Sequence, residues 1–486
     1  LLKRFPQTEE GFSAARDDLL AALDPILGQI GLGFERDIDP WLGDQVAFYL
    51  LPPDAGEDPS SGAVLLSIDG DEEAALDAVE KALSSSPESF ETDARTYEGI
   101  DYNLVRSEVL TQAVFGSGAT STASDEGPLI AYGVVDEHLV FGSNEAFRAS
   151  VDARDGDALE FTTDFKEATD GFADDRVALV YLQNGTLFDS IESSGIDAEG
   201  EEALDILREQ GADGGSALAL RATADALVME ASAVLEDDSP AAELGDVAGP
   251  DLLEGFPKDA WLALGVTELG QKIRSALDLA SNLGMPGDPI EDVSAAFEAE
   301  TGLDLQDDVL AWLGDTGLFV RGRTITDIGG ALVVESTDPD RTGKVVDALR
   351  DLVEAEQPGL TQDVEREGLS GFTFRFGPTP PINVLGGDRL VIAYGGIATD
   401  AVLSPEETLD DSERYGAATD ALGRQPALYL DLAAVLELVE AFSPDAQGDR
   451  TYQTEVKPIL EQLSFLAVSG HRDGDVVYQQ LVIGAK

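Results

Sequence analysis

Short apolar runs alternate with polar turns along most of the chain, and fewer, longer segments show apolar residues at helical spacing. Residues 216–233 and 465–482 each contain two alternating apolar runs around a polar turn, which predicts a β-hairpin. Helical spacing predicts the longest helices at residues 11–30, 71–83, 200–210, 268–283, 340–356 and 430–442. Strand-like runs outnumber helices and are joined by short turns. The pattern therefore predicts an α+β fold with largely antiparallel sheets.

The same order of motifs occurs twice. The segment around Trp41 (residues 39–44) returns around Trp312 (residues 310–315), 271 positions later. Further matching pairs follow in the same order: 62–66 with 330–334, 136–141 with 387–392, 165–182 with 415–432, and 216–233 with 465–482. Because self-similarity defines the unit of folding, we expect two tandem homologous repeats, each a curved sheet with helices on one face.

The repeat divides the chain into residues 1–235, an acidic Pro/Gly linker at 236–251, and residues 252–486. A chain of this length exceeds the roughly 250–300 residues at which single cores stop growing. Repeat two opens with an apolar run at 260–266 that has no counterpart in repeat one. We expect this first strand, with a signal peptide or membrane anchor, in polypeptide that precedes Leu1. Divergence of the first repeat is the alternative.

Charge excludes one class of partner. The chain has 96 acidic and 30 basic residues, a formal net charge of -66. A polyanion of this size is repelled by nucleic acid and by anionic lipid surfaces. The acidic surface is open to three interpretations: solubility combined with genome composition, adaptation to high salt, and cation binding.

Cysteine is absent, which excludes disulfides, thiolate nucleophiles and zinc–thiolate sites. Together with the acidic surface and the expected upstream segment, this favours an exported protein.

Catalytic candidates are few. The two histidines, His138 and His471, occupy non-equivalent positions in the repeats, and the sequence has no Gly-x-Ser-x-Gly motif that would place a nucleophilic serine beside one of them. A pair of carboxylates could support glycosidase-type hydrolysis, but sequence does not single out such a pair. We expect no enzymatic activity, and a carboxylate-based hydrolase is the alternative.

Calcium is a metal for which the sequence offers candidate ligands. Aspartates cluster in turns, where hard oxygen ligands suit Ca²⁺, although none of the clusters has EF-hand spacing. We expect no cofactor, with calcium as the alternative at these candidates: Asp69, Asp71, Asp152, Asp155, Asp157, Asp473 and Asp475.

Two other features invite a functional interpretation. Trp41 and Trp312 belong to the repeated motif, so we expect them to fill the core rather than contact a ligand. Residues 108–128 form a Ser/Thr/Gly/Ala-rich insertion in repeat one with a small apolar patch. Such a segment is typical of an adaptable lid, and passive disorder is the equal alternative.

The Trp-Leu-Gly-Asp turn, followed by an apolar strand, a second strand, a helix and a later Leu-Val-(Phe/Ile) strand, resembles an uncharacterised family of predicted secreted or membrane-anchored bacterial proteins, domain of unknown function 3352. Residues 256–260, Phe-Pro-Lys-Asp-Ala, are similar to the turn near the start of family members, and repeat one lacks this turn. The resemblance implies an extracytoplasmic location and supplies no catalytic residues.

These observations predict a non-enzymatic, extracytoplasmic binding or structural module of the cell envelope, secreted or anchored at the outer face of the cytoplasmic membrane. Its partner is expected to be another protein, or a hydrophobic small molecule held between sheet and helices or between the repeats. A subunit of a surface filament or lattice is a further alternative.

Overall fold

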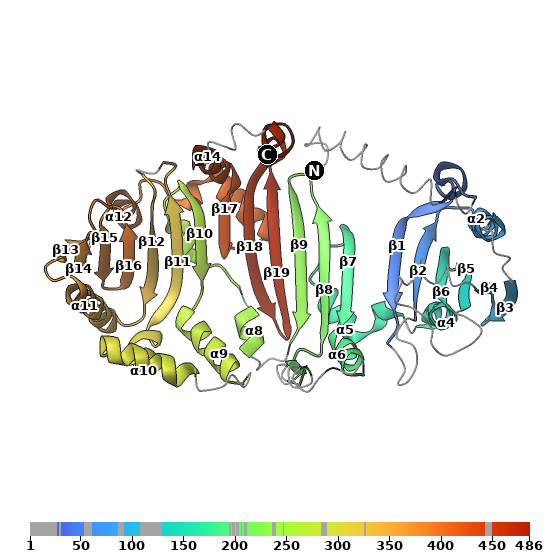
Figure 1. Cartoon of the computed structure of the whole chain (residues 1–486), viewed down its shortest axis with the longest axis horizontal. Helices are drawn as coiled ribbons and strands as arrows, with labels where there is room; N and C mark the ends of the chain where they lie inside the picture. The colour runs from blue at the N-terminus through green and yellow to red at the C-terminus, as the bar shows by residue number, and fades with distance from the viewer. Residues whose placement is uncertain are drawn as a thin grey trace. The chain divides into compact units, whose positions relative to one another are not determined.

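The computed structural model forms two compact units, which are treated separately below (Figure 1). Among the described residues, the large unit comprises 167–184 and 198–486, and the small unit comprises 27–166 and 185–197. The structure describes residues 27–486 except 29–30, 53–60, 86–91, 107–128, 157, 194–195, 197–199, 201–203, 206, 209–210, 236–239, 246, 283–288, 325–326 and 443–449.

The small unit is built on a six-stranded antiparallel sheet of order β1-β2-β6-β5-β4-β3. Its strands are β1 (Leu42–Leu50), β2 (Gly62–Ile68), β3 (Thr92–Tyr97), β4 (Ile100–Arg106), β5 (Leu129–Val135) and β6 (His138–Ser143). Helix α2 (Glu72–Ser85) covers Ile68 and Leu139 on one face, and α4 (Asn144–Asp152) covers Ala63 and Val140 on the other. Helices therefore pack on both faces, where the sequence pattern predicted one.

The large unit is built on a thirteen-stranded antiparallel sheet of order β13-β14-β15-β16-β12-β11-β10-β17-β18-β19-β9-β8-β7. Its strands are β7 (Arg176–Gln183), β8 (Gly215–Ala222), β9 (Ala226–Val234), β10 (Ala260–Val266), β11 (Leu313–Arg321), β12 (Gly329–Ser336), β13 (Gln362–Arg366), β14 (Leu369–Phe374), β15 (Ile382–Gly386), β16 (Arg389–Tyr394), β17 (Leu428–Asp431), β18 (Leu463–Asp473) and β19 (Val476–Ala485).

Besides α2 and α4, the α-helices are α5 (Thr163–Thr169), α6 (Asn184–Ser193), α8 (Pro240–Gly245), α9 (Leu269–Asn282), α10 (Pro289–Thr301), α11 (Pro339–Glu356), α12 (Gly396–Leu403), α13 (Glu413–Leu422), α14 (Leu432–Phe442) and α16 (Lys457–Leu460). Four helices of repeat one have counterparts between the matching strands of repeat two: α2 with α11, α4 with α12, α5 with α13, and α6 with α14. The short 3₁₀ and π turns are η2 (Phe34–Ile38), η3 (Ala153–Asp155), η4 (Leu159–Phe161), η5 (Asp251–Gly255), η6 (Leu305–Leu310), η7 (Leu409–Asp411) and η8 (Tyr452–Val456).

The α+β class and the antiparallel pairing expected from the sequence are confirmed, and the strand order is compatible with the two repeats. Strands β11 to β19 recur in the order of β1 to β9, while β10 has no counterpart in the described part of repeat one. The last three strands of repeat one belong to the large unit, because β9 pairs antiparallel with β19. The units thus divide the chain within repeat one rather than at the expected linker 236–251, which contains the short helix α8.

Four helices lie where the hydrophobic periodicity predicted them. The segments 71–83, 268–283, 340–356 and 430–442 are confirmed as α2, α9, α11 and α14, and both hairpins are confirmed as β8–β9 and β18–β19. The other two expected helices, at 11–30 and 200–210, fall largely outside the described residues. No helix within the described ranges is long and apolar enough to cross a membrane.

The repeated tryptophans fill the cores, as expected. Trp41 is 3% exposed and Trp312 is 1% exposed. Each side chain closes a π turn, because Trp41 Nε1 donates to the carbonyl of Asp37 at 2.6 Å and Trp312 Nε1 donates to that of Asp308 at 2.8 Å. The same local lock therefore occurs in both repeats.

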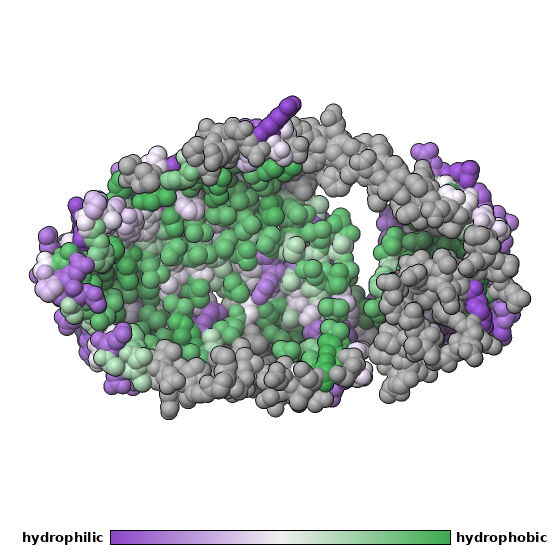
Figure 2. Space-filling view, viewed as in Figure 1, coloured by the Kyte–Doolittle hydropathy of each residue, from purple (hydrophilic) through white to green (hydrophobic). Residues whose placement is uncertain are grey.

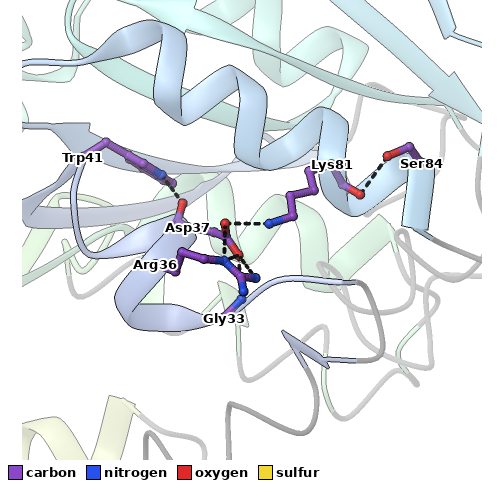
Figure 3. A network of polar contacts seen from close by, with 6 residues as sticks. All are labelled: Gly33, Arg36, Asp37, Trp41, Lys81 and Ser84. Atoms are coloured by element: carbon purple, nitrogen blue, oxygen red, sulfur yellow. Dashed lines mark hydrogen bonds and ion pairs between the residues drawn. The ribbon is translucent and has the colours of Figure 1, made fainter.

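The lock of repeat one is reinforced by charge (Figure 3). The Asp37 carboxylate accepts hydrogen bonds from Lys81 Nζ at 2.7 Å, from the Gly33 amide at 2.8 Å, and from the neighbouring Arg36 guanidinium. These donors hold the pKa of Asp37 well below its ordinary value, chiefly through Arg36 and Lys81. The pair with Lys81 fastens the turn to helix α2.

Candidate functional site: an exposed apolar sheet face

One face of the large sheet carries an unbroken row of apolar side chains that crosses the strands. Each member lies directly opposite the next in adjacent strands. We name this set the transverse row: Ala178, Leu220, Met229, Leu481, Val468, Leu428, Leu264, Leu318, Leu332, Ile392, Val384 and Phe372. Because neighbouring strands are about 4.8 Å apart, the row extends on the order of 50 Å along the sheet.

A second apolar row runs beside the first on the same face, two residues along each strand. Its members are Ala222, Leu227, Ile483, Leu466, Leu430, Leu262, Val320, Gly330, Tyr394, Ile382 and Phe374. Tyr394 is the one member with a polar atom, and it is 39% exposed. Together the two rows make the face apolar over the width of a flat ligand as well as along its length.

The opposite face of the same sheet is packed in the ordinary way. Small side chains such as Ala263, Ala467 and Val482 are fully buried there. Helices α12 and α13 cover them, with Tyr415 of α13 and Leu409 of η7 in the same core. This core buries one face of the sheet, whereas on the other face α11 covers only the end of the transverse row at Val384 and Phe372.

The exposed fraction of the side chains varies along the transverse row. Met229 is 42% exposed and Leu264 is 37% exposed, whereas the row is buried at Val384 and Phe372 where α11 packs on it. Helices α9, α11 and α14 contact strands of this face. Figure 2 shows apolar residues gathered over the middle strands of the large unit. The face is thus an apolar surface bordered by helices and open along its middle.

The chemistry of this face is hydrophobic. No member of either row is charged, so the surface offers burial of apolar groups rather than ion pairing or proton transfer. Extended apolar patches on soluble proteins mark sites for ligands or partners, because leaving them in water is unfavourable.

A polar cavity of about 830 Å³ lies elsewhere in the large unit. Three of its basic side chains are already paired: Lys258 with Glu407 at 3.0 Å, Arg414 with Asp431 at 2.6 Å, and Arg321 with Asp259. Acidic residues outnumber basic ones in its lining. The cavity therefore offers little attraction to an anion.

The calcium candidates lie in separate turns. Asp69 and Asp71 join β2 to α2, where Asp71 accepts from the Ala74 amide at 3.0 Å and so begins the helix. Asp152 ends α4 and Asp155 lies in η3, whereas Asp157 is outside the described residues. Asp473 and Asp475 flank the β18–β19 turn. Within the ranges that the structure describes, no three metal-binding side chains gather. Calcium binding stays a prediction.

The two histidines have structural partners. His138 Nδ1 lies 2.8 Å from the carbonyl oxygen of Asp136. The ring of His471 stacks on Tyr478 with centroids 4.9 Å apart. The insertion 108–128, interpreted above as a lid, lies outside the described residues.

Carboxylates with shifted acidity do not resemble a general acid. The pKa of Asp327 is lowered by hydrogen bonds from the Thr324 side chain and amide, and that of Glu354 by bonds from Thr361 and Gly359. A hydrolytic acid needs the opposite shift, produced by desolvation or a second carboxylate. These groups act as caps of turns, and they give the hydrolase alternative no support.

The fold and this face define an acidic, cysteine-free α+β protein that presents an apolar sheet surface. The family model described as "Protein of unknown function (DUF3352)" matches residues 6–479. The chain therefore belongs to this family, and the resemblance seen in the tryptophan turns is confirmed. No curated protein and no solved structure matches it.

The sequence predicted a hydrophobic ligand between sheet and helices as one alternative, but it did not identify the residues that form this face. A signal was present in strands such as β12 and β19, whose runs Ala-Leu-Val-Val and Leu-Val-Ile are apolar at consecutive positions. Continuous apolar runs indicate that both faces of a strand avoid water. The rows themselves require the register between strands.

Proposed function

We propose that this protein is a non-enzymatic binding protein for an elongated hydrophobic molecule, such as a lipid acyl chain, which lies along the transverse row. The proposal rests mainly on one observation. Aligned apolar side chains form a row with one member on each of twelve strands, and the row members Met229 and Leu264 are more than a third exposed. A linear ligand matches this arrangement because it can cover successive members of the row.

The charge of the chain supports a dissolved ligand rather than docking to a membrane. At a net charge of -66, approach to an anionic bilayer is opposed by electrostatic repulsion. Single hydrophobic molecules experience no such barrier. In our proposal the protein acts outside the cytoplasm, where it carries or holds hydrophobic molecules of the cell envelope.

The test is a series of saturated fatty alcohols of increasing chain length, titrated against the full chain by displacement of a fluorescent apolar probe. Burial of each CH₂ contributes about 0.8 kcal/mol, which corresponds to a roughly fourfold gain in affinity per added carbon. Affinity that rises with chain length until the row is filled supports the proposal. Affinity independent of chain length, or no displacement, contradicts it.

A surface filament or lattice subunit is the second candidate, and the same exposed face favours it, because self-association would also bury the row. Sedimentation of the ligand-free chain separates the two. A monomer at micromolar concentration supports carriage of a ligand, and concentration-dependent assembly that fatty alcohols do not dissolve supports the lattice.

A further inference from the structure

Strand β1 ends the small sheet, whereas its counterpart β11 is an interior strand. Both strands follow the tryptophan turn, and both are bulged near their start. Beyond the bulge, Tyr49 opposite Ala63 matches Phe319 opposite Ala331. In the large unit β10 pairs with β11 along its other edge. In the small unit, no described strand pairs with that edge of β1.

The side chains of β1 are correspondingly exposed. Val46, Phe48 and Leu50 are 68%, 56% and 60% exposed. By the same alignment Phe48 matches Leu318, which lies directly opposite Leu264 of β10. An end strand with apolar side chains and free backbone groups is a template for a further strand.

A cavity of about 810 Å³ lies beside β1, within the small unit. Its floor is formed by Tyr49 and Leu65, and turn η4 forms one wall. In that turn Leu159 is 49% exposed and Phe161 is 56% exposed. Large apolar side chains therefore line this cavity, next to an edge of β1 that no strand among the described residues pairs with.

Repeat two shows what fills the corresponding space. Leu409 of η7 is the counterpart of Leu159, and it is fully buried. It packs with Leu253 and Phe256, which are buried in the same core, and its amide donates to the carbonyl of Phe256 at 2.8 Å. Thus the segment 251–266, turn η5 followed by β10, covers η7 and completes the edge of β11.

We propose that the small unit binds one further polypeptide segment of the same design. A turn with apolar side chains fills the cavity beside η4, and the following strand pairs antiparallel with β1. The occupant is a polypeptide segment with the design of 251–266, in which a turn with apolar side chains precedes a strand. This site is separate from the transverse row and takes a peptide rather than a lipid.

A second copy of the chain is the competing occupant, and the geometry disfavours it. Pairing of two β1 edges would join two strands, but it would bring no apolar turn to Leu159 and Phe161. The cavity lined by those side chains would remain open. The design of segment 251–266 fits both features at once.

The first experiment adds a copy of residues 249–271 directly before Leu1, which reproduces the spacing of repeat two. Hydrogen exchange of alternate β1 amides is expected to slow about tenfold or more, since pairing removes local opening. The matched control carries Leu253→Asp and Phe256→Asp in the copied segment only, which removes the apolar turn, and it should restore fast exchange. Unchanged exchange in the first variant overturns the proposal.

The second experiment adds a synthetic peptide of residues 249–266 to the unaltered chain. The peptide is expected to protect the β1 amides from exchange. Its affinity, measured from this protection, should fall about tenfold in Leu159→Asp, because that substitution places a charge against an apolar ligand. Ile397→Asp, a similarly exposed position on α12 of the large unit, should leave the affinity unchanged. Protection that appears with chain concentration alone identifies a second copy and overturns the proposal, as does protection insensitive to Leu159→Asp.

Discussion

Leu264 of β10 lies directly opposite Leu318 of β11 on one side and opposite Leu428 of β17 on the other. All three side chains belong to the transverse row. Leu264 is 37% exposed even though its strand is in the interior of the sheet. The centre of the transverse row is thus placed by backbone pairing and not by burial in a core.

Substitution Leu264→Asn should weaken binding of an acyl chain about tenfold, because it removes apolar contact at the centre of the row. Stability should change by about 1 kcal/mol or less, since the side chain is already partly in water. Probe displacement and urea unfolding measure the two effects. Ile397→Asn, an exposed position on the helix-covered side, is the control, and an equal loss of binding in both variants would refute a role specific to the face.

Substitution Trp312→Phe should destabilise the large unit by about 1–3 kcal/mol, because it leaves a cavity and removes the hydrogen bond to the Asp308 carbonyl. Trp41→Phe should have a similar effect on the small unit, through Asp37. Hydrogen exchange of β11 and of β1 reports each unit. Normal protection of both strands in both variants would show that the tryptophan locks contribute little.

Acid should weaken the small unit through Asp37. Its pKa in the folded chain is lowered from the ordinary 3.8, chiefly by hydrogen bonds from Arg36 and Lys81. A lowered pKa stabilises the folded state above the ordinary value, and this contribution is lost as pH falls through the folded value. Unfolding followed from pH 6 to about pH 2 should therefore be less pH-dependent in Asp37→Asn than in the parent chain. Identical slopes would show that the network of Figure 3 is not coupled to stability.

High pH should destabilise the core of the large unit through Tyr415 and Tyr429. Their rings meet edge to face with centroids 5.2 Å apart. Burial raises the pKa of both phenols above the ordinary 10.0. A raised pKa means that the stabilisation is complete below pH 10 and is lost as pH rises through the folded values. In an ultraviolet titration, Tyr415→Phe and Tyr429→Phe should each show one fewer phenol that ionises above pH 10 than the parent chain. Ionisation of all tyrosines near pH 10 without unfolding would contradict this burial.

Much of the local structure could be predicted from the sequence, because local signals have local causes. Helical spacing predicted the helix at 340–356, and in the structure the Asp338 carboxylate caps its start by accepting from the Arg341 amide at 3.2 Å. The repeated Trp-Leu-Gly-Asp motif predicted two buried tryptophans. These features depend on residues within a few positions of one another.

The candidate site could not be predicted in the same way. The transverse row includes Met229 opposite Leu481, and that contact depends on β9 pairing with β19 across the two repeats. A one-residue change of register would move one strand's apolar set to the other face. The division of repeat one between two compact units likewise follows from long-range pairing.

Binding along the transverse row can be measured by native mass spectrometry of the full chain with a C16 fatty alcohol, repeated with Leu264→Asn. We expect a one-to-one complex with the parent chain and a marked loss of that complex in the variant. No complex with the parent chain, or an equally abundant complex in both proteins, would contradict binding along the transverse row.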